Sequence, residues 1–68
     1  MANGTVKWFN DTKGYGFIAP EEGGKDVFVH ISAVERSGLR GLADNQKVTY
    51  DLEAGRDGRE SAVNIALA

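Results

Sequence analysis

Two aromatic side chains separated by one residue stand out in the segment 13–18, which reads Lys-Gly-Tyr-Gly-Phe-Ile. In a β-strand, side chains two residues apart point to the same face, so Tyr15 and Phe17 should lie side by side, with Lys13 in line behind them. Glycine inside a strand usually marks a bend or a close approach by another group. A cation followed by two rings on one face can contact phosphate and stack on bases. The segment therefore predicts a surface for flat, negatively charged polymers.

A second strand carrying rings follows at 26–31, Asp-Val-Phe-Val-His-Ile. Its alternation gives valines to one face and Phe28 and His30 to the other. A short connection between strands 13–19 and 26–31 predicts that they pair as neighbours in a meander. Cross-strand neighbours on one face then bring Phe28 and His30 beside Tyr15 and Phe17.

The rest of the chain supplies further short strands and no long helical pattern. We expect five strands at 4–10, 13–19, 26–31, 46–53 and 60–67, with Pro20 ending the second, an exposed loop at 21–25 and an Asp-Gly turn at 55–58. The expected inward side chains are Val6, Val48, Tyr50, Leu52, Val63, Ile65 and Leu67. Residues 32–35, Ser-Ala-Val-Glu, fit a capping box and predict one short 3₁₀ turn, capped by Ser32. Five short strands predict an all-β fold, a small closed or nearly closed barrel.

The bulk composition limits the function. With 68 residues the chain is expected to form one domain, 1–68, and without cysteine it has no disulfide and no thiolate metal site. No apolar run approaches the roughly 18 residues of a membrane helix and no signal pattern is present, so we expect a cytoplasmic protein without a membrane partner. The formal charge of −2 lacks the basic excess typical of phosphate binders. Nucleic-acid affinity would have to come from local arrangement and stacking.

The chain as a whole resembles a bacterial cold-shock domain. The resemblance is carried by residues 4–10 (Gly-Thr-Val-Lys-Trp-Phe-Asn), 13–18, 26–30 and the pair Asn64-Ile65, and it spans almost all of 4–65. It implies a five-stranded antiparallel OB-type barrel that binds single-stranded RNA and DNA with little sequence preference. It also implies an RNA-chaperone role, in transcription antitermination or translation regulation. We expect no cofactor and a monomeric state.

Carried over position by position, the resemblance implies a nucleic-acid-binding surface made of Lys7, Trp8, Asn10, Lys13, Tyr15, Phe17, Phe28 and His30. At its margin the resemblance adds Phe9, Asp26, Ile31 and Leu39. Ile31 and Leu39 stand where the family commonly has aromatic side chains. Segment 13–18 also resembles the start of the RNP1 pattern of RRM domains, but the chain lacks the two long helices that an RRM needs.

Other interpretations of the same residues are less favoured. The rings could fill the core, but both faces of a strand cannot be core in one small barrel. Trp8 could mainly pack, His30 could be a structural histidine, and lysines are solvated by default. A single histidine and no cysteine argue against an enzyme. A protein-interaction barrel would use the same apolar patch without explaining the lysines beside the rings.

Overall fold

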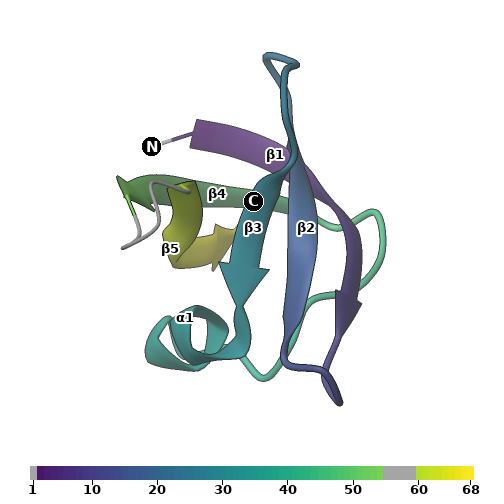
Figure 1. The fold of residues 1–68 in the computed structure, drawn as a ribbon, viewed down its shortest axis with the longest axis vertical. Coiled ribbons are helices and arrows are strands. Elements are labelled where there is room, and N and C mark those ends of the chain that lie inside the picture. The colour runs from purple at the N-terminus through teal and green to yellow at the C-terminus, as the bar shows by residue number, and fades with distance from the viewer. Residues whose placement is uncertain (1, 55–59) are drawn as a thin grey trace.

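The computed structural model describes residues 2–54 and 60–68, and it shows a closed five-stranded barrel (Figure 1). The elements are β1 (Ala2–Asn10), β2 (Tyr15–Pro20), β3 (Val27–His30), α1 (Ile31–Arg36), β4 (Lys47–Ala54) and β5 (Glu60–Leu67). Around the barrel the strands follow the order β1-β2-β3-β5-β4. The all-β barrel predicted from the sequence is confirmed. The turn predicted at 55–58 lies outside the described residues.

The barrel closes through one parallel pairing. β1 pairs antiparallel with β2 and β4, β2 with β3, and β4 with β5, whereas β3 and β5 run parallel and pair at Phe28 and Ser61. A ring with an odd number of strands cannot alternate direction throughout, so at least one neighbouring pair must be parallel. The expected antiparallel pattern therefore holds for every pair except this closing one.

The core follows the predicted alternation in β2 and β3 but departs from it in β5. The buried apolar side chains are Val6, Ile18, Val27, Val29, Val34, Leu42, Val48, Tyr50, Ala62 and Ile65. The pairing of Thr49 with Ala66 is followed by that of Asp51 with Val63, so two residues of β5 lie opposite Tyr50. This β-bulge contains Asn64, whose φ is +51°.

The bulge corrects the inward set predicted for β5. It resets the alternation, so Ala62 and Ile65 point inward, three residues apart, while Val63 is half-buried and Leu67 is 52% exposed. Leu52, also predicted inward, is 49% exposed because it lies at the open mouth of the barrel. A pattern of period two cannot reveal a bulge, because the bulge changes the phase of the pattern.

The single helical segment also differs from the prediction. Residues Ile31–Arg36 form an α-helix of six residues rather than a 3₁₀ turn near 32–35. The Ser37 N–H donates to the Ala33 carbonyl at 3.1 Å, an α-helical bond. The helix begins earlier than predicted because His30, not Ser32, is its N-cap.

The buried Tyr50 side chain predicts that the stability of the barrel falls at alkaline pH. Its side chain is fully buried, and desolvation, with the nearby Glu22 carboxylate, raises the pKa of the phenol above 10.0. A raised folded-state pKa leaves stability intact below about pH 10 and reduces it as the pH rises from there through the folded-state value. We expect the free energy of unfolding to fall in this window, and to fall less in Tyr50→Phe. Urea titrations of both proteins between about pH 8 and about pH 11 check this, and equal slopes would contradict it.

Candidate nucleic-acid interface

Five rings from three adjacent strands gather on the outer face of the barrel. We call this set, Trp8, Tyr15, Phe17, Phe28 and His30, the aromatic platform. The strand register places Phe17 opposite both Trp8 and Phe28, and Tyr15 opposite His30. Neighbouring ring centroids lie 5.4 Å apart for Trp8–Phe17, 5.9 Å for Phe17–Phe28 and 5.9 Å for Tyr15–Phe28. The surface is continuous across β1, β2 and β3.

Trp8 faces outward because β1 contains a bulge at Lys7. Val6 pairs with Ile18 and Trp8 with Phe17, so Lys7 is an extra residue on β1. Val6 is fully buried, and in a regular strand Trp8 would share its inward face. The bulge turns Trp8 out, where it is 39% exposed. The sequence left its direction open, since alternation alone does not reveal the bulge.

Gly16 lets β1 lie close against β2 below the platform. A Cβ at this position would overlap the carbonyl oxygen of Trp8 and would lie 2.7 Å from the Cα of Phe9. The inference that a strand glycine marks a close approach is confirmed here. Phe9, opposite Gly16, is half-buried and packs against the core. The absence of a side chain at Gly16 therefore leaves room for the β1 backbone that carries Trp8.

The charged residues around the platform are partly compensated. The Lys7 ammonium lies 3.0 Å from the Asp26 carboxylate, and both side chains are exposed to solvent. These two residues flank β2 on either side, so their ion pair crosses β2 at the level of Phe17 and Ile18. Such exposed pairs contribute about 1 kcal/mol or less. A phosphate can therefore compete for Lys7, but the pair lowers the positive potential of this edge.

Asn10 and Lys13 shape the turn that leads into β2. The Lys13 backbone N–H donates to the Asn10 side-chain oxygen at 3.0 Å, and the Gly14 N–H donates to the Asn10 carbonyl at 2.8 Å. Asn10 pairs with Tyr15 at the end of β1. The Lys13 side chain is exposed. The turn therefore holds a cation near the Tyr15 end of the platform.

His30 caps helix α1 and also contributes a ring to the aromatic platform. Its Nδ1 accepts the Ser32 backbone N–H at 3.1 Å and lies 2.9 Å from the Ser32 hydroxyl. With Nδ1 acting as the acceptor, the neutral ring carries its proton on Nε2, which leaves a donor on the other side of the ring. The ring also lies 6.3 Å from Phe28, at a tilt of 37°. The cap fixes the orientation of the last ring of the platform.

Residues at the predicted margin take different positions. Leu39 is half-buried and packs against the core. Ile31 opens α1 and lies against Gly14, where an added Cβ would come 3.3 Å from its Cγ2. Neither adds a ring to the surface. Asp26 lies at the edge through its pair with Lys7.

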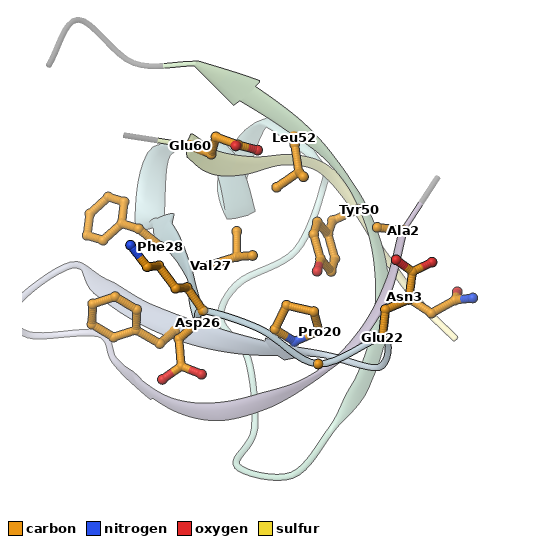
Figure 2. Close-up of a pocket in the computed structure, with 13 residues that line it drawn as sticks. Ala2, Asn3, Pro20, Glu22, Asp26, Val27, Phe28, Tyr50, Leu52 and Glu60 are labelled. Carbon is orange, nitrogen blue, oxygen red and sulfur yellow. The ribbon is translucent and has the colours of Figure 1, made fainter. Parts of the chain in front are cut away.

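A groove of about 690 Å³, which the sequence pattern does not predict, lies at the mouth of the barrel. Figure 2 shows Val27, Tyr50 and Leu52 converging on it, and Phe17 and Phe28 connect it to the platform. Lys25 also lines it. The loop 21–25 gave no periodic signal, so the position of Lys25 beside the rings could not be derived. In the described ranges, no three His, Asp or Glu side chains gather as metal ligands.

Substitution can separate the N-cap role of His30 from the base contact predicted for its ring. Asparagine is among the best N-cap residues and has no ring, whereas alanine has neither an acceptor nor a ring. We expect His30→Asn to retain the free energy of unfolding while weakening oligonucleotide binding about fivefold, as expected for one lost stack. His30→Ala should bind as weakly and also lose about 1 kcal/mol of stability. Urea denaturation and fluorescence titration measure both, and full binding by His30→Asn would exclude the ring from the interface.

The comparison with known families identifies this arrangement. Residues 2–68 match the model of the 'Cold-shock' DNA-binding domain. The chain belongs to the cold-shock domain family. Cold-shock proteins bind nucleic acids and are not enzymes, so the prediction against an enzyme is confirmed. In the described part of this cold-shock domain, no helix is long and apolar enough to cross a membrane.

Several bacterial cold-shock proteins are similar over nearly their whole length. The "Probable cold shock protein y4cH" of Sinorhizobium fredii is 64% identical over 66 residues, 96% of each chain. "Cold shock protein CspA" of Rhizobium meliloti is 58% identical over 69 residues, covering both chains completely. "Cold shock-like protein CspE" of Escherichia coli is 52% identical over 64 residues, 94% of this chain and 93% of the relative. The predicted resemblance to the family is confirmed.

Proposed function

We propose that the aromatic platform binds single-stranded RNA and DNA by stacking bases on its rings, with little sequence preference. The observation that carries this is the continuous set of rings across three strands, on the face opposite the core valines. A ring can stack on a base only where the base is not already stacked in a duplex, so the ligand is single-stranded. The proposed contacts come from Lys7, Trp8, Asn10, Lys13, Tyr15, Phe17, Phe28 and His30.

Stacking supplies the main part of the affinity in this proposal. Each base on an aromatic side chain contributes about 1–3 kcal/mol by alanine substitution, so four or five stacks support micromolar to nanomolar binding after ordering costs. Lys7 is paired with Asp26, which leaves few uncompensated cations near the rings. The dependence on salt is therefore shallow, with a slope of about −0.7 for each phosphate neutralised.

The cellular role that follows is that of an RNA chaperone. A protein that binds only opened strands shifts hairpins toward the open form by mass action, without ATP. Acting on nascent or translated transcripts, as a cytoplasmic monomer, it would favour transcription antitermination or translation. Membership of the cold-shock domain family supports nucleic-acid binding, on which this proposed role depends.

A fluorescence titration tests the binding proposal. Trp8 is part of the platform and is the single tryptophan of the chain, so stacked bases should quench its emission. We expect quenching by a single-stranded oligonucleotide and little by the matched duplex, at several salt concentrations. Equal binding of both forms, or no quenching together with no gel shift, would overturn the proposal. A hairpin carrying a fluorophore and a quencher then tests for opening without ATP.

A further inference from the structure

The outer surface of the sheet continues beyond the last ring of the platform. β3 has β5 as its other neighbour, with Phe28 opposite Ser61. Ala62 is fully buried, so the residues on either side of it, Ser61 and Val63, face outward like Phe28. A strand of nucleic acid that crosses β1, β2 and β3 would reach β5 next.

Helix α1 turns this continuation into a groove. The groove has a volume of about 290 Å³, and its lining includes Phe28 and His30 from the platform, Ser32 and Arg36 from α1, and Ser61 from β5. Figure 1 shows α1 at the end of β3, next to β5, and α1 packs against β5. The Ser37 hydroxyl accepts the Ile65 N–H at 2.8 Å. The wall is therefore fixed to the sheet, and the groove opens directly from the platform.

The lining of the groove favours a phosphodiester group over a stacked base. Apart from Phe28 and His30, no described residue of the lining carries a ring on which a further base could stack. Arg36 is exposed, and no carboxylate of the described ranges forms an ion pair with it. Glu53 is the one acidic side chain among the described residues of the lining. A guanidinium without a carboxylate partner is well suited to phosphate oxygens.

The residues on the other side of His30 offer no competing continuation. Ile31 lies against Gly14 and Leu39 packs on the core, so neither extends the rings. We infer that the groove between α1 and β5 is a further subsite for the strand, in which Arg36 binds the phosphate that follows the nucleotide on His30. This rests on the proposed function, and it names Arg36 as a determinant of how many nucleotides the protein engages.

A series of oligo-dT lengths, from about four to about eight nucleotides, tests the subsite with Trp8 fluorescence. Three proteins are compared: wild type, Arg36→Gln, and Arg40→Gln. Arg40 is exposed and lies outside the groove lining, so its substitution matches the change in net charge. We expect wild type and Arg40→Gln to gain affinity at the length that first reaches the groove. For Arg36→Gln, this increase in affinity should be about threefold smaller than for wild type. The salt slope of Arg36→Gln on long oligonucleotides should be shallower by about 0.7.

The outcomes separate this inference from the proposed function. If the Arg36 and Arg40 variants show the same affinities and salt slopes at every length, the groove is not a subsite, although the platform still binds. If Arg36→Gln weakens the shortest and longest oligonucleotides equally, Arg36 acts on the platform itself and the inference is also wrong. If no length quenches Trp8 in the wild type, the proposed function has failed.

Discussion

Replacing Phe28 with alanine is expected to weaken oligonucleotide binding at least tenfold while the barrel stays folded. Phe28 lies at the centre of the platform, with ring neighbours Tyr15 at 5.9 Å, Phe17 at 5.9 Å and His30 at 6.3 Å. Its loss removes one stacking surface and breaks the continuity between β2 and the end of β3. A tenfold change corresponds to about 1.4 kcal/mol, which is within the range for one base.

The fold should tolerate this change because Phe28 is half-buried on the outer face, while Val27 and Val29 hold the inner face of β3. Leu67→Ala provides a matched control, since Leu67 is 52% exposed and lies outside the platform. Titration with oligo-dT gives the affinities and urea denaturation gives the stabilities. If Phe28→Ala binds like wild type, the platform is not the binding surface.

Replacing Gly16 with alanine should destabilise the barrel more than the same change at any other glycine that the structure describes. The added methyl group would overlap the Trp8 carbonyl and lie 2.8 Å from a ring carbon of Phe9. The first of these neighbours is backbone, so β1 must move as a whole. Overpacking of this kind costs about 1–3 kcal/mol, and more where backbone must shift. In a domain this small, that is a large share of the total stability.

The same substitution should also reduce binding, because the backbone that moves carries Trp8. We expect a lower urea midpoint together with a shift in Trp8 emission in the folded state. Gly41→Ala is the control: its added Cβ would lie 3.3 Å from a carboxylate oxygen of Asp11, at the end of a side chain that can move. Equal stability of the two variants would show that β1 has room at this point.

The sequence was most informative where the strands are regular. In β2 and β3 the period of two assigns Ile18, Val27 and Val29 to the core, and the structure buries all three. The pairing of Phe17 with Phe28 and of Tyr15 with His30 follows once these strands are neighbours. Alternation and short connections were therefore enough to predict the centre of the candidate site.

The parts that could not be predicted depend on irregular backbone. The bulges at Lys7 and Asn64 change which side chains face inward, and each lies where the register between two paired strands shifts by one residue. Similarly, Ser32 has the side chain of a typical N-cap, yet His30 takes that role because it precedes the helix and its Nδ1 reaches the Ser32 N–H. The positions of bulges and of the N-cap are decided by tertiary packing, which local residue preferences do not encode.

The single parallel join of the barrel has a consequence for binding. β3 and β5 are paired at one position only among the described residues, and that position is Phe28 with Ser61. Among the described residues, the strand junction with the fewest paired positions therefore lies beneath the central ring of the platform. A nucleic-acid strand that crosses this junction would contact both β3 and β5. Because such a ligand binds only when the two strands are paired, its binding would stabilise the closed barrel. The affinity for nucleic acid and the stability of the β3–β5 junction are then thermodynamically linked.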